Sequence, residues 1–373
     1  MTMPERKLER FDSYLTAVEA FLDEPWSDGL PVIPPTPALV ERMVAAGARG
    51  MDECLGIVPR RDLPLYVWQA ATCAVMAGCK PEYFPVVLAT WEAMLDPRFS
   101  LHTVLSSTGG VAIAAVVSGP YAEKIGMRSG MGVFGPGNRA NATIGRAIRL
   151  GAFTALKAIT GELDASSFGH AGKYTFHFAE GDLPSSGSTT WPSIREQFGY
   201  AASATTVSII PAEAPRQIMH RFQPTAEDMF KAIGHTMRDP AQNGTGTDTC
   251  SMLVLGPEHA SIFADAGMMP GELRREFARR ARTSIDALAA AGFRYDYPGN
   301  RYNAPDAEGN IAGASAGHIL VVPSGGPGAG WSAYIPSWSW VDDGHPITRP
   351  VCLPGQPVPV RDAARAEADL DFV

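Results

Sequence analysis

A change of pattern near residue 110 constrains the fold of this chain more than any other feature of its sequence. Beyond that point, short runs rich in β-branched residues alternate with segments of helical periodicity, which is typical of α/β proteins. The runs lie at 111–117, 174–178, 205–210, 250–255 and 318–322. We therefore expect an α/β fold in which mixed sheets, with strands in these runs, pack against helices.

The first hundred residues have a different, helical pattern. Apolar side chains recur there at helical spacing, and prolines mark the ends of the segments. Residues 29–37 must be extended, because proline disfavours helix in the residue before it. The predicted helices cover 4–24, 37–46, 64–78 and 81–96. This predicts a helical N-terminal segment that precedes the α/β body.

One short segment occurs twice in weakly similar form. Residues 117–127 and 254–268 each run from the end of a predicted strand through a Gly-Pro turn and a short helix to Gly-Met. Longer predicted helices follow at 140–159 and 270–291. The repetition favours two pseudo-repeated α/β halves that meet face to face, although so common a pattern also arises without duplication. The expected regions are a helical N-terminal region at 1–100, a first half at 101–215 and a second half with a C-terminal extension at 216–373.

Composition and charge bear on the class of partner. The chain has 373 residues and a formal charge of -8, and it contains no run of Lys or Arg, so nucleic acid is not an expected partner. Its first residues lack the apolar stretch of a secretory signal, and no segment approaches the length of a membrane span, so we expect a cytoplasmic protein that does not enter membranes. Five cysteines without a CxxC pair indicate reduced thiols. The aromatic residues Trp331, Tyr334, Trp338 and Trp340 are typical of a core or a subunit interface, and we expect a homo-oligomer.

Residues 135–149 contain the most informative pattern for function. The helix predicted here is apolar on nearly all sides, yet it carries Arg146 and Arg149. A buried guanidinium group needs a negative partner, and the glycines before the helix allow a ligand to approach its N-terminus. We expect a carboxylate or phosphate pocket here. The alternative is that both arginines pair with structural acids such as Glu162 or Asp164.

The candidate reactive groups lie in other segments. Cys79 lies between two predicted helices and beside Lys80, where positive charge would stabilise a thiolate, so it is the candidate nucleophile; a buried inert thiol is the alternative. Lys173 precedes the run at 174–178 and His177 lies within it, and both are candidate polar catalytic partners. The glycine-rich loop with Ser324, Gly325 and Gly326 follows a predicted strand, a position that lines ligand crevices in α/β folds.

No cofactor is predicted. The Gly-x-Gly-x-x-Gly sequence at 130–135 follows a helix-like segment and meets Pro136, and the sequence contains no Walker A pattern. A divalent metal stays open as an alternative, because His170, His177 and Glu180 lie close in sequence, but their spacing matches no helical metal motif.

Four segments carry a resemblance to a known family: residues 28–37, 74–86, 135–149 and 172–174. They resemble the so-called UGSC proteins, a largely uncharacterised bacterial family linked to a selenocysteine or cysteine motif. The resemblance implies functional roles for Cys79, Asn138, Arg139, Asn141, Arg146 and Lys173. The chain has no Cys-Gly-Ser-Cys sequence of its own, so the resemblance transfers no redox reaction.

These observations favour a small-molecule enzyme that acts on an anionic, carboxylate-type substrate by hydrolysis or elimination, as a hydrolase or lyase. Asn138, Arg139, Asn141, Arg146 and the loop at 324–326 would bind the substrate. Two alternatives remain. One is a thiol-dependent oxidoreductase; the other is a non-catalytic, ligand-binding accessory subunit whose partner protein carries the catalytic selenocysteine or cysteine.

Overall fold

Strand β3 (Ala112–Ser118) separates two hydrophobic cores in the computed structural model. The structure describes residues 4, 6–239, 249–294, 305–311, 315–328, 330–338 and 346–367. Ala112, Ala114 and Val116 lie in one core, whereas Ala115 and Val117 lie in the other. This alternation follows from the two-residue period of a strand. A strand buried on both faces belongs to the middle layers of a layered α/β fold.

Two mixed four-stranded sheets form the centre of the molecule. In the first, β3 pairs in parallel with β4 (His177–Ala179) on one side and antiparallel with β7 (Thr206–Ala212) on the other, and β14 (Ile347–Pro350) completes the far edge. In the second, β9 (Ser251–Leu255) takes the place of β3. Its neighbours are parallel β12 (Ile319–Pro323) and antiparallel β13 (Trp331–Pro336), with β8 (Arg216–Met219) at the edge.

The two halves follow the same order of elements. After β3 come the Gly-Pro turn, α6 (Pro120–Lys124), α7 (Arg139–Thr154), β4 and β7; after β9 come the Gly-Pro turn, α10 (Pro257–Asp265), α11 (Pro270–Arg280), β12 and β13. The predicted α/β fold with two pseudo-repeated halves is thereby confirmed. A residue range alone does not separate the sheets, because the edge strands β8 and β14 each follow, in the chain, a strand of the other sheet. β8 follows β7 but pairs with β13, and β14 pairs with β7 although it follows β13 in the chain.

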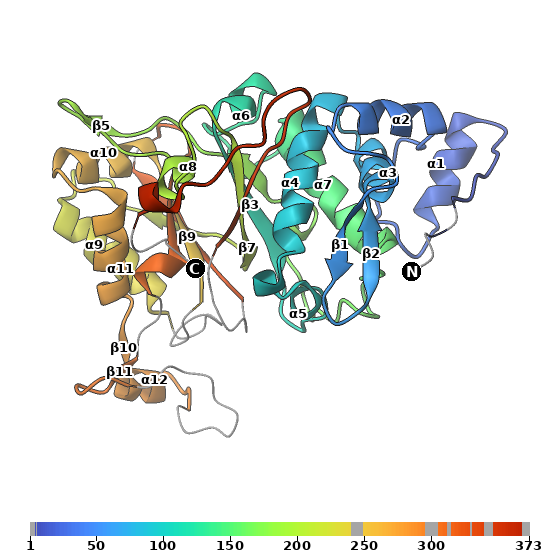
Figure 1. Cartoon of the computed structure of the whole chain (residues 1–373). Helices are drawn as coiled ribbons and strands as arrows, with labels where there is room; N and C mark the ends of the chain where they lie inside the picture. Colours follow the sequence, from blue (N-terminus) through green and yellow to red (C-terminus); the bar gives the residue numbers. More distant parts are fainter. Residues whose placement is uncertain are drawn as a thin grey trace.

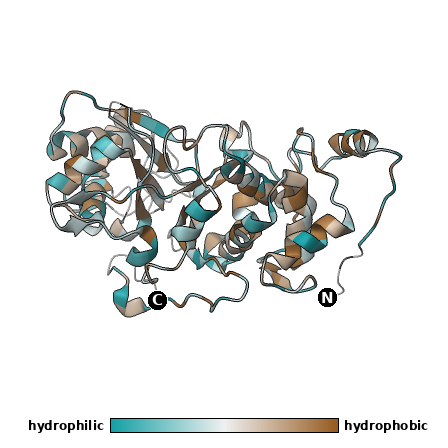
Figure 2. Cartoon of the chain, turned by 90° about the horizontal axis from the view of Figure 1, so that it is seen from above, coloured by the Kyte–Doolittle hydropathy of each residue, from teal (hydrophilic) through white to brown (hydrophobic). Residues whose placement is uncertain are grey.

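The sheets pack face to face between two helical layers (Figure 1). Apolar residues of β3, β4 and β7 meet those of β9, β12 and β13 in one core. On the outer face of the first sheet lie α3 (Val67–Ala77), α4 (Phe84–Met94) and α7; on that of the second lie α9 (Ala226–Met237), α10 and α11. Figure 2 shows teal and brown alternating along the helices at the second sheet's side, as amphipathic helices require.

The N-terminal region covers the helices of the first half. It contains α1 (Tyr14–Leu22), α2 (Pro37–Ala45) and, in place of a purely helical segment, an antiparallel pair of strands, β1 (Cys54–Val58) and β2 (Leu63–Tyr66). The first predicted helix begins later than expected, because Ser13 caps it by accepting a hydrogen bond from the Thr16 amide. The helix predicted over 37–46 is confirmed, and Pro37 occupies its first turn.

Two other predicted elements end or begin elsewhere. The helix predicted over 270–291 stops at Arg280, because Thr283 pairs with Ile311 and Ser284 caps a separate helix, α12 (Ile285–Ala290). The strand predicted at 174–178 begins only at His177, since Thr175 instead donates a hydrogen bond to the Asn141 carbonyl.

The remaining helices and strands are α5 (Leu101–Leu105), β5 (Ser185–Ser186), β6 (Thr189–Thr190), α8 (Ile194–Gln197), β10 (Thr283–Ser284) and β11 (Asn310–Ile311). In the described residues, no helix is long and apolar enough to cross a bilayer.

Candidate functional site

The connection between α7 and β4 brings a cluster of charged side chains together around Asp164. The Arg149 Nη2 group donates to Asp164 Oδ2 at 2.6 Å, and Lys173 Nζ lies 2.8 and 2.7 Å from the two carboxylate oxygens. The Ser166 hydroxyl lies 2.6 Å from Oδ1 and also receives a hydrogen bond from Lys173 Nζ at 2.7 Å. We call Arg149, Asp164, Ser166 and Lys173 the polar cluster.

Local turns fix the geometry of this cluster. Asp164 accepts a hydrogen bond from the Ser166 amide, as in an Asx turn, and Lys173 ends a short 3₁₀ helix that His170 caps by accepting from the Gly172 amide. Ser167 donates its amide proton to the Thr108 carbonyl, which ties the loop to the segment before β3. The cluster is therefore held by its backbone as well as by its ion pairs.

Burial and pairing shift the ionisation of the cluster in definite directions. Burial alone would raise the pKa of Asp164, but hydrogen bonds from Lys173, Ser166 and Arg149 outweigh it and bring that pKa to about 2. For Lys173, burial together with the nearby Arg149 outweighs the attraction of Asp164, so its pKa is lowered from the usual value. Asp164 is thus ionised at neutral pH, while the ammonium form of Lys173 is less favoured than in water.

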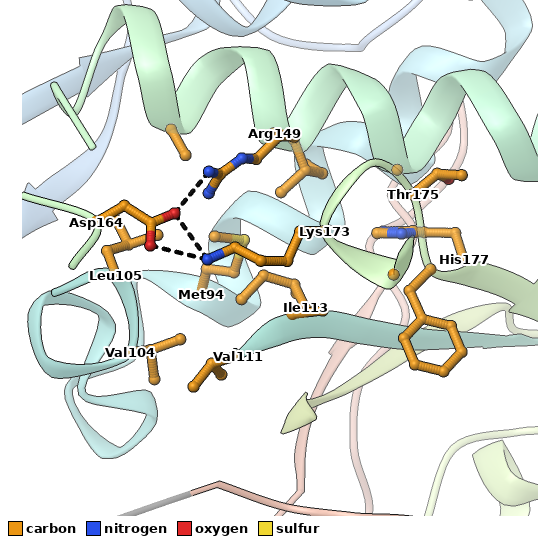
Figure 3. A pocket seen from close by; sticks show the side chains of 16 residues that line it. Met94, Val104, Leu105, Val111, Ile113, Arg149, Asp164, Lys173, Thr175 and His177 are labelled. Carbon is orange, nitrogen blue, oxygen red and sulfur yellow. Dashed lines mark hydrogen bonds and ion pairs between the residues drawn. The ribbon is translucent and has the colours of Figure 1, made fainter. Parts of the chain in front are cut away.

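The polar cluster lies between two hollows. An inner cavity of about 30 Å³, measured as the space open to the centre of a water molecule, lies under α7 and is shared by Arg149, Asp164, Lys173 and His177 (Figure 3). An outer cleft of about 300 Å³ on the same measure shares Arg149, Asp164 and Lys173 with this cavity. The residues that line the cleft are Ser27, Asp28, Arg149, Phe153, Thr160, Asp164, Ser166, Phe168, Gly169, His170, Lys173 and Tyr174. Its size suits a small molecule.

The outer cleft contains unused hydrogen-bond donors. The charged side chains that line it are two bases, Arg149 and Lys173, and two acids, Asp28 and Asp164. Among the residues that the structure describes, the Nε and Nη1 groups of Arg149 have no hydrogen-bond partner, because only its Nη2 group reaches Asp164 and Thr160. A guanidinium group with unused donors is an environment that attracts an anion.

Arg146 does not need a ligand for its charge. It forms a two-point ion pair with Asp28, at 2.7 and 2.9 Å, and also donates to the Leu30 carbonyl. Asp28 begins the extended segment whose prolines keep it out of a helix. For Arg149, the acid is Asp164, one of the two structural partners that the sequence offered as an alternative to an external anion.

The polar residues at the start of α7 stabilise the fold. Asn138 caps the helix by accepting from the Asn141 amide, and its own amide group donates to the Gly126 carbonyl. Asn141 bonds both backbone groups of Arg128, while Arg139 donates to the Gly78 carbonyl. These side chains line neither the inner cavity nor the outer cleft.

The candidate nucleophile Cys79 is buried apart from the polar cluster. Its thiol donates to the Thr143 carbonyl at 3.2 Å, and it lines neither hollow. Burial raises the pKa of this thiol to about 12, although Thr143, Arg139 and Arg146 oppose the shift. The neighbouring Lys80 is turned to Glu82 and the ring of Tyr83. These surroundings favour the protonated, unreactive thiol.

His177 lies at the opposite end of the inner cavity from Lys173 (Figure 3). The Thr90 hydroxyl donates its one proton to the Val86 carbonyl, so it accepts a hydrogen bond from His177 Nε2 at 3.3 Å. The other ring nitrogen of His177, Nδ1, has no hydrogen-bond partner among the described residues. Burial lowers the pKa of His177 to about 3, so the ring is neutral. The cavity beside it has room for a water molecule.

The glycine-rich loop after β12 joins the two halves. The Ser324 hydroxyl lies within hydrogen-bond distance of the Ser129 and Ala179 carbonyls, and the Gly325 amide donates to Ser129. The Gly326 α-carbon packs so closely on Met131 that a side chain there would clash. The Ser324 hydroxyl and the Gly325 amide therefore serve the contact between halves in this structure.

A metal ligand set does not form from the three residues close in sequence. His170 contacts the Ala212 carbonyl and the Gly172 amide, His177 contacts Thr90, and Glu180 accepts from Ser118. Over the described ranges, no group of three His, Cys, Asp or Glu side chains is arranged to hold an ion.

Sequence reasoning missed Ser166 and Asp28 as members of this region. Ser166 follows Asp164 in an ordinary polar loop. Asp28 begins one of the segments that resemble the UGSC proteins, but it is 118 residues from its partner Arg146 and was not itself a candidate. Only the short spacing of Asp164 and Ser166 hinted at a turn. Among the aromatic residues near the end of the chain, Tyr334 is buried and Trp331 is partly exposed, while Trp340 lies outside the described residues.

Comparison of the chain with protein-family models, curated proteins and solved structures finds no match. The resemblance to the UGSC proteins therefore stays a prediction, and the geometry of the site carries the argument on function.

Proposed function

We propose that the outer cleft binds a small molecule with a carboxylate group and that the chain hydrolyses an ester or amide bond in it. Arg149 would hold the carboxylate, Ser166 would act as the nucleophile, and Lys173 would transfer the proton. The observation that carries this proposal is the 2.7 Å contact between Lys173 Nζ and Ser166 Oγ beside the unused donors of Arg149.

The contacts of Lys173 suit a neutral amine as proton acceptor. A neutral amine has two N–H groups and one lone pair, and Lys173 Nζ has three neighbours: the two oxygens of Asp164 and the hydroxyl of Ser166. The N–H groups can donate to Asp164 while the lone pair accepts the Ser166 proton, once that proton turns away from Asp164 Oδ1 and the Gly109 carbonyl, which lie 2.6 and 2.9 Å from Ser166 Oγ. Burial lowers the pKa of Lys173, which enlarges the fraction that is neutral.

The reaction is balanced with water as the only co-reactant. Ser166 Oγ bonds to the substrate's acyl carbon as its proton passes to Lys173. The bond to the leaving alcohol or amine then breaks, and the leaving group takes the bonding electrons together with the proton from Lys173. Water repeats the sequence on the acyl-serine, which releases the acid and restores Ser166.

A serine-directed fluorophosphonate probe tests this proposal. We expect the probe to label Ser166, located by mass spectrometry of peptides, and labelling to become faster as the pH rises, because a neutral Lys173 is required. Lys173→Arg keeps the positive charge beside Asp164 but cannot act as a base, so we expect it to slow labelling by about 100-fold. Ser167→Ala, at the exposed neighbouring serine, is the matched control and should label normally. Labelling of another serine, or undiminished labelling of Lys173→Arg, would overturn the hydrolytic mechanism.

A second function, binding without catalysis, is favoured by one observation. If Lys173 is protonated, its three N–H groups match the same three acceptors, and the polar cluster is then a satisfied ion-pair network. An accessory subunit would bind the anion with Arg149 and show no labelling of Ser166. The same probe experiment therefore separates the two functions.

A further inference from the structure

The rim of the outer cleft exposes aromatic side chains that the fold does not use. Phe168 is 100% exposed and Tyr174 is 51% exposed, and both line the cleft. A large aromatic residue in water forgoes the stabilisation that burial would give it. Exposed apolar groups that gather at a concave, charged site are typical of ligand contacts.

The backbone, rather than the Phe168 side chain, sets the position of this loop. On one side, the Ser167 amide donates to the Thr108 carbonyl at 2.9 Å. On the other, Gly169 has a φ of +65° and lies against Gly110 so closely that a side chain at Gly110 would meet it at 3.0 Å. Phe168 is thus presented at the rim by a clamped turn, which lowers the entropic cost of using it for binding.

The deeper part of the cleft holds the positive charge. Arg149 lies over the ring of Phe153, with 4.1 Å between its guanidinium carbon and the ring centroid, so its planar face is already covered. The unused Nε and Nη1 groups are left for an anion in the plane of the guanidinium, which suits a carboxylate. A cleft of about 300 Å³ is at the small end of ligand pockets, and a single ring fills such a space.

From this arrangement we infer that the ligand is an aromatic carboxylate, whose acid group binds Arg149 and whose ring packs between Phe168 and Tyr174. This inference rests on the proposed function, because it assigns a chemical class to the ligand of the same cleft. It predicts that the cleft prefers anions with a flat apolar group, whereas anion binding by Arg149 alone would show no such preference.

Isothermal titration calorimetry of the full chain with benzoate, acetate and benzamide tests the inference. We expect benzoate to bind at least ten-fold more tightly than acetate, because only benzoate buries a ring, and more tightly than benzamide, which lacks the charge. Phe168→Ser should weaken benzoate binding about ten-fold and leave acetate binding unchanged. Phe222→Ser is the matched control, because Phe222 is 93% exposed and does not line the cleft.

The outcomes separate this inference from the function beneath it. Equal affinities for acetate and benzoate that Arg149→Met abolishes would overturn the aromatic ligand and leave the anion site standing. Unchanged benzoate binding by Phe168→Ser would also overturn the aromatic ligand. If the unmodified chain binds neither benzoate nor acetate, or if Arg149→Met binds both normally, the proposed anion site itself is wrong.

Discussion

The two halves of the molecule have the same topology but use the layer between helices and sheet in different ways. In the second half, Phe230, Phe263 and Phe277 pack ring against ring beneath α9, α10 and α11. In the first half, the layer under α7 contains the inner cavity and the polar cluster. The same scaffold therefore supports a filled apolar layer in one copy and a charged, hollow layer in the other.

The connection after the long helix accounts for much of this difference. In the first half, α7 and β4 are joined by a loop that folds back over the helix and supplies Asp164, Ser166 and Lys173. In the second half, the chain leaves α11 at Arg280 and forms α12 and the pair β10–β11 before it returns as β12. Functional side chains are thus gathered by a connection, while the strands and helices supply its rigid support.

The largest difference in stability between the two halves should appear when a carboxylate that pairs with two cations is neutralised. Asp164 and Glu276 each pair with two cations, but the Asp164 side chain is 2% exposed and that of Glu276 is 23% exposed. We expect Asp164→Asn to lower the free energy of unfolding by roughly 3–5 kcal/mol, because it leaves Arg149 and Lys173 buried without their acid. Glu276→Gln should cost below about 1 kcal/mol. Urea unfolding measures both, and equal losses would contradict the distinction.

A smaller effect on stability should come from the residue that follows the edge strand paired in parallel, which is β4 in the first sheet and β12 in the second. This residue is Glu180 after β4 and Ser324 after β12. Burial raises the pKa of Glu180 to about 7, against the hydrogen bonds of Ser118 and the Ile194 amide and the charge of Arg195. The folded state therefore binds this proton more tightly than the unfolded state does. The stability it confers is complete below about pH 4.3 and is lost as the pH rises through 7, by about 3 kcal/mol in total.

Unfolding of Glu180→Gln between pH 4 and 8 checks this linkage. The decline in stability with rising pH should be shallower in Glu180→Gln than in the unmodified chain. Ser324→Ala serves as the comparison in the other half, since it removes hydrogen bonds without removing a titrating group. It should shift the whole curve and keep its slope; a parallel shift for Glu180→Gln would contradict the assignment.

The smallest of these differences should appear at glycines on the two long helices. A side chain at Gly145 of α7 would meet Thr175 Oγ1 at 2.3 Å and His177 Nδ1 at 2.9 Å, whereas the nearest atom to one at Gly271 of α11 would be the terminal Oε2 of Glu367, at 2.9 Å. We expect Gly145→Ala to lower the free energy of unfolding by about 2 kcal/mol and Gly271→Ala by under about 1 kcal/mol. Thermal unfolding of both variants measures the difference. Similar values would mean that α7 can move away from β4.

Much of the fold could be predicted because it depends on local patterns. The β-branched runs located β3, β7, β9 and β12, and the two Gly-Pro turns revealed the repeated order of elements. The exchange of β8 and β14 could not be predicted, since short edge strands have little pattern of their own and pair according to what the opposite sheet offers.

The candidate site was predictable only in part. Arg149 and Lys173 were singled out separately, and the structure joins them through Asp164. Cys79, Asn138, Asn141 and the loop at Ser324 were candidates because of residue type and position in the chain. In the structure, hydrogen bonds within the fold occupy these groups.

The sequence by itself determined which segments become strands and helices, because the alternation of apolar residues in β3 and the Gly-Pro turns act over a few residues. It also determined that the arginines of α7 must find negative partners, since burying an unpaired guanidinium group is too costly. Only the tertiary structure decided which partners they find. Asp28 and Asp164 reach Arg146 and Arg149 across the fold, and that pairing leaves the Nε and Nη1 groups of Arg149 without a hydrogen-bond partner among the described residues beside the outer cleft.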